Sequence, residues 1–211
     1  MFRKLTNFIQ NQKCHAKSRK KFSQSRRLMG LLNLLKKLKT QDREIRVLLL
    51  GLEGSGKTTV AHAFANEKIE TDLSPTNGFE IHKFEHQNHQ IHIWDIGGSP
   101  PNRAFWRNYF DSTDVILWTI DSADPSKFEE SKRELENCLQ NDRLFGVPVV
   151  LIATKQDANG ASQFPGVISN LQLNIGERNF NAIPFSPGQN ENIQKCLTWI
   201  VNEFLAKASA H

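Results

Sequence analysis

Residues 51–58 read Gly-Leu-Glu-Gly-Ser-Gly-Lys-Thr, which is the pattern G-x-x-x-x-G-K-T. The apolar run 47–50 precedes this stretch, and the helix-like segment 58–66 overlaps its end. A strand, a glycine-rich loop and a helix in this order predict a phosphate-binding loop. The glycines let the backbone turn tightly and point N–H groups at a phosphate chain, and the positive end of the helix adds to the attraction. The motif alone does not distinguish ATP from GTP.

Strand-like and helix-like segments alternate from residue 45 onward. A polar, histidine-rich turn between the second and third expected strands indicates a hairpin. Apolar strands that alternate with helices are typical of an α/β protein. We therefore predict a doubly wound, mostly parallel six-stranded sheet flanked by helices. The expected strands are 45–50, 80–84, 90–94, 115–120, 147–153 and 182–185, and the expected helices are 58–66, 126–140 and 191–206.

The basic residues are concentrated at one end of the chain. The 211 residues carry a net charge of +5, yet residues 1–40 contain 12 Lys and Arg residues and no acidic residue. Residues 41–211 hold the other 15 basic residues against 22 acidic ones, so the predicted globular domain, 41–208, is mildly acidic. Because the folded part is not basic, the sequence disfavours a specific nucleic-acid-binding domain.

Two short segments are expected before the globular domain. Residues 1–28 are predicted to be a basic, disordered extension, with a mitochondrial presequence, a nuclear signal and a patch for anionic lipids as alternatives to a solvated tail. Residues 29–40 are expected to form an amphipathic helix, which suits a membrane interface or a groove on the same protein. Peripheral membrane contact would use basic residues 1–39 and the leucines on one helix face, Leu31, Leu34, Leu35 and Leu38.

The sequence does not favour a membrane-spanning or disulfide-bonded protein. No apolar run reaches the roughly 18 residues that a transmembrane helix requires. The three cysteines, Cys14, Cys138 and Cys196, are too few and too scattered for a disulfide framework or a zinc site. These features are typical of a reduced, cytoplasmic protein.

Residues beyond the phosphate loop are expected to complete a site for a nucleotide and Mg²⁺. Lys57 would reach the outer phosphates, and the Thr58 hydroxyl would bind the ion. Asp95, which follows an apolar strand, would hold the ion through water, and Gly98 would offer its N–H to a terminal phosphate. Thr76 would join the ion when a third phosphate is present. The expected phosphate-binding residues are Gly51, Glu53, Gly54, Ser55, Gly56, Lys57, Thr58, Thr59, Thr76 and Gly98.

The segment Thr154-Lys155-Gln156-Asp157 follows another buried strand and is expected to bind the base. A carboxylate at Asp157 accepts two hydrogen bonds from guanine, one from N1–H and one from the 2-amino group. Adenine lacks this pair of donors. Asp157 therefore predicts that the nucleotide is GTP rather than ATP.

Taken together, these motifs resemble those of the Arf family of small GTPases. The resemblance implies the P-loop NTPase, small-GTPase G-domain fold and a monomeric GTP-dependent switch that uses Mg²⁺. It also implies GTP hydrolysis to GDP, an exchange factor, an activating protein and effectors. For Arf-like members it implies protein or membrane trafficking at Golgi or cilium-related membranes, with release of lipid-modified cargo. The resemblance covers residues 29–205 and is carried by 51–58, 75–79, 94–98, 106–110, 121–124 and 154–157.

Three site residues depart from the family pattern. The family places Gln, which orients the attacking water, where this chain has Ser99 followed by two prolines. Serine is too short for that task and the prolines stiffen the segment, so we expect slow hydrolysis. Thr154 replaces an Asn, which weakens contacts to guanine N7 and to the phosphate loop. In the last guanine-binding loop Ser186 matches, but Pro187 has no N–H for the guanine carbonyl, so we expect reduced nucleotide affinity.

The start of the chain also differs from the family. Gly30 would be myristoylated only if translation began at Met29, and the acceptor pattern requires Ser or Thr where this chain has Leu34. The sequence leaves open whether Met1 or Met29 is the physiological start. It therefore also leaves the role of residues 1–28 open.

The predicted hairpin and the segment after it contain side chains with two interpretations each. In the family the hairpin slides in register between nucleotide states and expels the N-terminal helix, and the polar residues 80–89 are compatible with a weakly fixed register. His82, His86, His89 and His92 form either a solvated hairpin face or a metal site. His62 is interpreted as a packed or surface residue. The aromatic group Trp106, Tyr109 and Phe110 belongs either to the core or to an effector surface.

Three other functions remain as alternatives to the switch. A degenerate G domain that acts as a non-hydrolysing binding scaffold is suggested by Ser99, Thr154 and Pro187. An ATP-using P-loop kinase would need a lid and a second substrate site, and Asp157 argues against it. Nucleic-acid binding through the basic arm is the third. Affinity for guanine nucleotides separates the switch from the scaffold.

Overall fold

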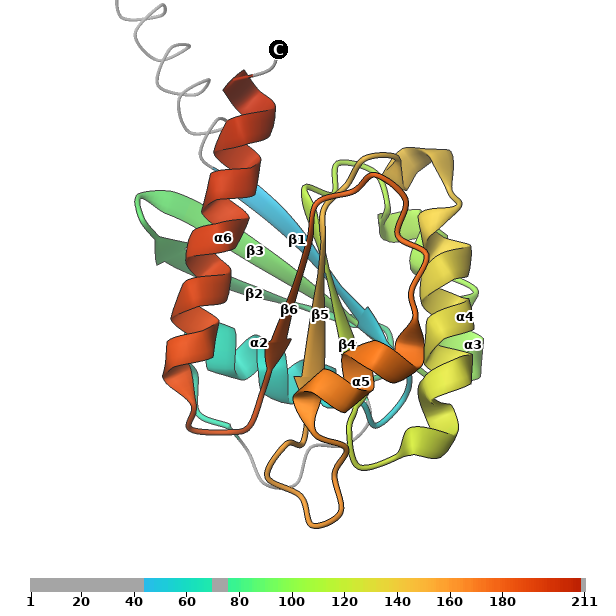
Figure 1. Ribbon diagram of the computed structural model, residues 1–211. Helices are drawn as coiled ribbons and strands as arrows, with labels where there is room; N and C mark the ends of the chain where they lie inside the picture. The colour runs from blue at the N-terminus through green and yellow to red at the C-terminus, as the bar shows by residue number, and fades with distance from the viewer. Residues whose placement is uncertain (1–43, 70–75, 210–211) are drawn as a thin grey trace, which may run out of the picture. The chain divides into compact units, whose positions relative to one another are not determined.

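The computed structural model describes residues 44–69 and 76–209 (Figure 1). One six-stranded sheet has the order β2-β3-β1-β4-β5-β6. The β2–β3 pair is antiparallel and the other four pairings are parallel. This confirms the predicted doubly wound, mostly parallel sheet. The strands are β1 (Glu44–Gly51), β2 (Phe79–His86), β3 (His89–Ile96), β4 (Val115–Asp121), β5 (Val149–Thr154) and β6 (Phe180–Pro184).

Helices cover both faces of the sheet, as Figure 1 shows. On one face α2 and α6 pack over a cluster that includes Val60 and Ile200, and on the other α4 and α5 pack over a cluster that includes Leu135 and Val167. Each such side chain contributes about 1.5–3 kcal/mol when it is fully buried. The helices are α2 (Lys57–Ala65), α3 (Pro100–Arg103), α4 (Phe128–Leu139), α5 (Phe164–Leu171) and α6 (Asn190–Ser209), with 3-10 turns η1 (Trp106–Tyr109), η2 (Pro125–Lys127) and η3 (Asp142–Leu144).

The β2–β3 hairpin closes through a two-residue turn. Gln87 and Asn88 have φ angles of 48° and 61°, the left-handed region that the tightest hairpin turns require at both central positions. The register pairs His86 with His89 next to this turn and Phe79 with Ile96 at the other end. This confirms the predicted hairpin and places its open end beside the phosphate loop.

Most expected elements are confirmed, with shifted ends. β5 begins at Val149 rather than at residue 147, because Pro148 has no N–H to donate to a neighbouring strand. The short helices α3 and α5 were not predicted, because Pro100, Pro101 and Pro165 interrupt the helical pattern in the sequence. In the structure these prolines lie in the first turn of their helices, where proline is accepted. The predicted extension 1–28 and the amphipathic helix 29–40 lie outside the described residues. Within the described ranges, no helix combines the length and apolarity needed to span a bilayer.

Candidate functional site

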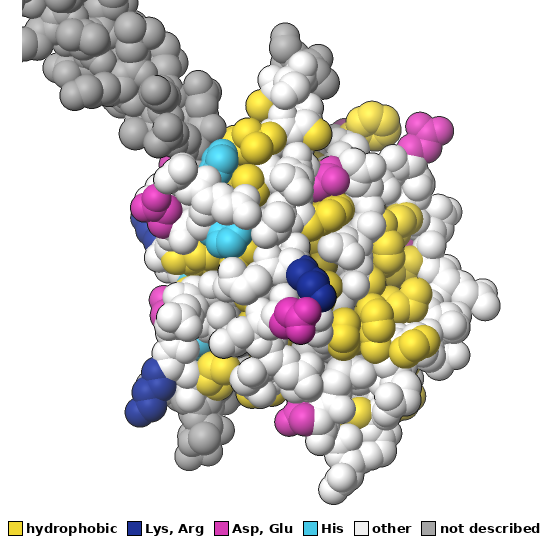
Figure 2. Space-filling model, turned by 60° about the vertical axis from the view of Figure 1, so that its left-hand side comes forward, with side chains coloured by type: hydrophobic (Ala, Val, Ile, Leu, Met, Phe, Trp, Pro, Cys, Tyr) yellow, Lys and Arg dark blue, Asp and Glu magenta, His cyan; other side chains and the backbone are white. Residues whose placement is uncertain are grey.

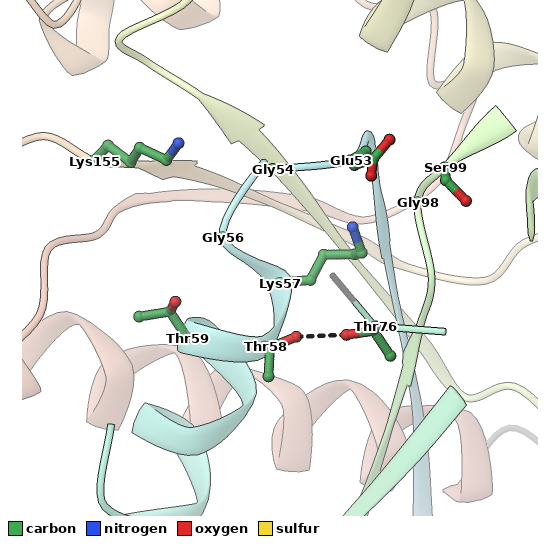
Figure 3. A pocket seen from close by; sticks show the side chains of 10 residues that line it. All are labelled: Glu53, Gly54, Gly56, Lys57, Thr58, Thr59, Thr76, Gly98, Ser99 and Lys155. Carbon is green, nitrogen blue, oxygen red and sulfur yellow. Dashed lines mark hydrogen bonds between the residues drawn. The ribbon is translucent and has the colours of Figure 1, made fainter. Parts of the chain in front are cut away.

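A cavity of about 260 Å³ lies where the phosphate loop meets the ends of the central strands (Figure 3). It is lined by Glu53, Gly54, Gly56, Lys57, Thr58, Thr59, Thr76, Gly98, Ser99 and Lys155. The structure thus brings together most of the predicted phosphate-binding residues. Gly51 and Ser55 lie behind the cavity. A Cβ on Gly51 would lie 2.3 Å from Thr119 Oγ1, and Ser55 Oγ lies 2.7 Å from the same Thr119 oxygen, so both positions fix the loop against β4.

Lys57 is folded over the loop that precedes it. Its ammonium group donates to the carbonyl oxygens of Leu52 at 2.9 Å and Gly51 at 3.2 Å. Burial lowers the pKa of Lys57 to about 8, and the negative charge of Asp95 opposes this shift. Figure 3 shows the ammonium group near the loop that carries Gly98, and a Cβ at Gly98 would lie 2.5 Å from Lys57 Nζ. It would also lie 2.4 Å from the Gly51 carbonyl oxygen, and because this backbone atom cannot move aside as a lysine end can, the close approach of the phosphate loop requires glycine at position 98.

Three oxygen-bearing side chains meet beside Lys57. The Thr58 hydroxyl lies 2.9 Å from the Thr76 hydroxyl (Figure 3). It donates to Asp95 Oδ2 at 2.6 Å, and the Thr76 hydroxyl is 3.5 Å from the same Asp95 oxygen. Asp95 is fully buried, and its Oδ1 has no hydrogen-bond partner among the described residues. Burial raises the pKa of Asp95, while the Thr58 hydroxyl and the Lys57 charge lower it. A buried carboxylate oxygen without a partner and two converging hydroxyls are suitable ligands for Mg²⁺ or its bound water.

The segment that follows Asp95 is held by contacts that the sequence did not reveal. Trp106 Nε1 donates to the Gly97 carbonyl at 2.9 Å, and Arg103 Nε donates to the Gly98 carbonyl at 2.9 Å. Arg103 also pairs with Glu130 of α4 at 2.7 Å. Asn102 Nδ2 donates to the Thr76 carbonyl at 3.4 Å. Asn102 therefore joins the Thr76 segment to the segment around Gly98, a link that no motif signals.

Ser99 lies at the edge of the cavity and begins α3. Its carbonyl oxygen accepts from the backbone N–H of Asn102 at 2.9 Å and of Arg103 at 3.1 Å. In Figure 3 the Ser99 hydroxyl points away from the Lys57 ammonium group. Pro100 and Pro101 occupy the first turn of α3, where a missing N–H has no cost. Ser99 therefore occupies the position of the water-positioning group, directly before α3, but its side chain is short.

Residues predicted to bind guanine come from two adjacent loops. Gln156 N donates to the Phe185 carbonyl at 3.3 Å, which brings the loops after β5 and β6 together. Lys155 reaches the cavity and pairs with Asp121 at 2.6 Å. Ser186 is buried, and its Oγ has no partner within the described part of the chain. Asp157 and Pro187 are exposed and do not line the cavity.

Thr154 keeps a contact that was expected to weaken. Its hydroxyl donates to the Ser55 carbonyl at 2.8 Å and to the Ile120 carbonyl at 2.9 Å. A hydroxyl carries one hydrogen, whereas the amide of Asn carries two. The connection between β5 and the phosphate loop is therefore present, but one hydrogen serves two acceptors.

The aromatic group is divided between the core and the surface. Trp106 and Phe110 are buried, and Trp106 packs edge-on against Trp118 with ring centroids 5.6 Å apart. Tyr109 instead lies with Phe79 and Trp94, at centroid distances of 5.5 and 6.1 Å. Phe79 is 49% exposed. Trp106 and Phe110 are therefore core residues, whereas Tyr109 is partly exposed, and an effector role for it stays a prediction.

The four hairpin histidines do not form one cluster. His92 pairs with Glu44 at 2.8 Å, and His89 Nδ1 lies 2.8 Å from the Gln87 carbonyl. His82 instead points toward α2, where it contacts Glu67 at 2.9 Å. The register puts His92 on one face of the hairpin and the other three histidines on the opposite face, where His82 is four residues, about 13 Å, away from His86 along β2. The metal site predicted from these four residues is therefore not formed within the described part of the chain.

Comparison with known proteins agrees with the geometry. The profile of the ADP-ribosylation factor family matches residues 31–204. The chain is similar to ADP-ribosylation factor-like protein 3 of Chlamydomonas reinhardtii, with 39% identity over 83% of this chain and 99% of that protein. It is similar to ADP-ribosylation factor-like protein 2 of Drosophila melanogaster, with 38% identity over 82% of this chain and 94% of that protein.

A solved structure has the same fold. It is the small GTPase Arl6 (BBS3) of Trypanosoma brucei with the nucleotide analogue GppNp, with a TM-score of 0.70 and 24% identity over 77% of this chain and 98% of that one. The match to the family profile and to both relatives extends over most of the chain and includes the phosphate loop and the Asp95 segment. The chain belongs to the ADP-ribosylation factor family, as an Arf-like small GTPase and GTP-binding switch.

Proposed function

We propose that the cavity beside the phosphate loop binds GTP and GDP together with Mg²⁺. The observation that carries this proposal is the meeting of Thr58, Thr76 and Asp95 within hydrogen-bond distance, directly beside Lys57. Lys57 would leave its loop carbonyls for the outer phosphates, where a cation is stabilised by the negative charge. The backbone N–H groups of residues 53–59 and of Gly98 would surround the phosphate chain.

The residues fit a magnesium ion. Thr58 would bind it directly, Asp95 would hold it through water by its unpartnered oxygen, and Thr76 would join it when the third phosphate is present. When bound, the ion supplies charge compensation for the phosphates. Burial disfavours the charged form of Asp95, and the Lys57 charge only partly offsets this, so an added positive charge there relieves the cost of burying a carboxylate.

Guanine selection is assigned to the two loops at the ends of β5 and β6. Asp157 would accept hydrogen bonds from guanine, and its exposure leaves it free to do so. Lys155, held by Asp121, would flank the base. The buried Ser186 hydroxyl lies in the loop that would face the guanine carbonyl, while Pro187 adds no donor there.

The presence of the third phosphate would be sensed by two segments in contact, one around Thr76 and one around Gly98. Thr76 and Gly98 would each contact a third phosphate, and Asn102 joins their segments through the Thr76 carbonyl. The β2–β3 hairpin lies between them in the sequence and ends at the exposed aromatic group of Phe79, Trp94 and Tyr109. This aromatic surface would receive effectors, and an exchange factor and an activating protein would act on the same segments.

We further propose a role in protein or membrane trafficking, on Golgi or cilium-related membranes, from a cytoplasmic location. The support is the similarity to Arf-like proteins and the basic, leucine-bearing residues 1–39, which would make peripheral membrane contact. Slow hydrolysis is part of the proposal, since Ser99 stands at the edge of the cavity with a short side chain.

A second candidate function is a G domain that acts as a non-hydrolysing scaffold. Ser99, the single hydrogen that Thr154 shares between two carbonyls, and Pro187 favour it. Measurement of the affinities for GTP, GDP and ATP with Mg²⁺ present separates the two functions. The switch requires affinities for GTP and GDP far tighter than for ATP. Millimolar affinity for guanine nucleotides would favour the scaffold, and a preference for ATP would contradict both.

A further inference from the structure

A cluster of two histidines and one glutamate lies between α2 and β2, away from the nucleotide site. His62 Nδ1 and His82 Nδ1 each lie 2.9 Å from the same oxygen, Glu67 Oε2. The ligand atoms of all three residues lie within 4.8 Å of one another. The two imidazole rings meet edge to face, with centroids 5.0 Å apart. This is a convergence of three potential metal ligands from separate elements.

The chain is shaped locally so that Glu67 reaches both histidines. α2 ends at Ala65 and is followed by Asn66, whose φ of 55° lies in the left-handed region that commonly ends helices. The backbone N–H of Glu67 then donates to the His62 carbonyl at 2.8 Å. This turn brings the Glu67 carboxylate back over the last turn of α2, where β2 presents His82. The position of Glu67 is therefore set by backbone geometry as well as by its own side chain.

The donor set matches a transition-metal ion. Two imidazole nitrogens and one carboxylate oxygen form a set that binds Zn²⁺ in proteins, with solvent as the remaining ligand. Imidazole also suits Co²⁺, Ni²⁺ and Cu²⁺, whereas Mg²⁺ and Ca²⁺ prefer oxygen ligands alone. Both histidines now direct Nδ1 at one carboxylate oxygen, and an ion would take the place of the hydrogens between them.

Burial and access are also suitable. The His82 side chain is almost completely buried, with 2% exposure, which limits its freedom and orients its ring. The Glu67 side chain is 40% exposed and His62 17%, so an ion can enter from solvent on that side. Some histidine side chains of the chain reach the surface, as Figure 2 shows for one face of the molecule. Neither histidine belongs to the cavity that holds Lys57 and Thr58.

We propose that His62, Glu67 and His82 form a binding site for a divalent transition-metal ion of the Zn²⁺ class. The ion would tie the C-terminal end of α2 to β2. His62 lies one helical turn after Thr58, on the same helix that leaves the phosphate loop. Its three residues are distinct from the proposed Mg²⁺ ligands, and none of them lines the cavity beside the phosphate loop.

The test is a titration of the full chain with Co²⁺ and Zn²⁺ in excess Mg²⁺. We expect Co²⁺ absorption bands of the d–d type without the charge-transfer band that a cysteine ligand gives. His62→Gln and Glu67→Gln should each weaken Co²⁺ and Zn²⁺ binding at this site by about 10-fold or more. Because His82 is buried, its replacement perturbs packing, so the more exposed His62 and Glu67 carry the test. Circular dichroism confirms that each variant is folded.

The matched control is His92→Gln. His92 also contacts a glutamate, Glu44, but among the described residues Glu44 contacts no second histidine. This control should bind Co²⁺ and Zn²⁺ as the unchanged chain does. Equal affinity and stoichiometry in the unchanged chain, His62→Gln and Glu67→Gln would overturn the proposal. So would a cobalt spectrum that shows only thiolate ligation, which would place the ion at a cysteine. Guanine-nucleotide affinity measured on the same samples reports the proposed function separately.

Discussion

The Thr154 hydroxyl at the end of β5 lies 2.8 Å from the carbonyl oxygen of Ser55 in the phosphate loop. The two residues are 99 positions apart in sequence, and the contact is buried. It connects the loop that would hold phosphates to the loop that would hold the base. This single hydrogen bond therefore links the two halves of the proposed nucleotide site directly.

Thr154→Val tests this connection. Valine has nearly the same shape but no hydroxyl, so the Ser55 and Ile120 carbonyls lose their shared donor. Loss of a buried hydrogen-bond partner costs about 1–3 kcal/mol, and we expect guanine-nucleotide affinity to fall by roughly 5–150-fold. Fluorescent-nucleotide titration measures the change. Thr198→Val is the control, because the Thr198 hydroxyl makes only exposed contacts, with the Gln194 carbonyl and with Gln87, and does not line the cavity, so its loss should leave affinity unaltered.

Ser99→Gln should restore hydrolysis. A longer amide side chain at the edge of the cavity can orient a water at the third phosphate, and the gain should be on the order of 10²-fold in the single-turnover rate. Ser99→Ala should leave the rate unchanged, since the hydroxyl points away from Lys57 (Figure 3). A gain much smaller than this in the glutamine variant would show that Pro100 and Pro101 or another group limits the reaction.

Asp157→Asn should remove the preference for guanine. The variant replaces a charged acceptor of two hydrogen bonds by an amide, and each such bond contributes about 1.5–3 kcal/mol. We therefore expect GTP and GDP affinity to fall at least ~10²-fold while ATP binding stays weak. Asp111→Asn is the control, because Asp111 is exposed and pairs only with Arg143 in the described ranges. Unchanged GTP affinity in Asp157→Asn would remove the basis for guanine selection.

The sequence was most informative where a functional residue follows a strand. The carboxyl ends of parallel strands meet at one edge of the sheet, and Lys57, Asp95 and Thr154 lie at that edge, as the local patterns predicted. Their roles in binding a nucleotide stay predictions. The Asn102 and Arg103 contacts were not predictable in this way. They depend on where α3 begins after Ser99 and on how α4 presents Glu130.

The contacts of His82 also depend on residues that are distant in the sequence. Period-2 alternation places His82 on one face of β2, but nothing in the strand indicates which helix covers that face. The partner His62 lies 20 residues earlier, and Glu67 reaches both only because Asn66 ends α2 with a left-handed turn. A hairpin-centred interpretation therefore grouped His82 with the wrong residues.

Removal of the metal ion should loosen the nucleotide. Thr58, Thr76 and Asp95 converge where Mg²⁺ would sit, so chelation with EDTA should speed the release of GDP by about 10-fold or more. In Thr58→Ala, release should be fast already and EDTA should add little to it. Stopped-flow measurement of a fluorescent GDP analogue gives both rates. An equal EDTA effect in the two proteins would mean that the ion does not use Thr58.

The two cysteines of the described domain should resist alkylation over the physiological pH range. Burial raises the pKa of both Cys138 and Cys196 to about 12, with Glu134 adding to the shift of Cys138. Only the thiolate reacts, so at pH 8 each holds roughly 10³-fold less reactive form than a free thiol. Modification by iodoacetamide, followed by peptide mass spectrometry, should be slow for both in the native protein and should rise with pH up to about 12. In denaturant both should react at the rate of an ordinary cysteine. Rapid native modification of Cys196 at pH 8 would mean that α6 opens from the sheet far more often than its buried contacts with β1 and β6 allow.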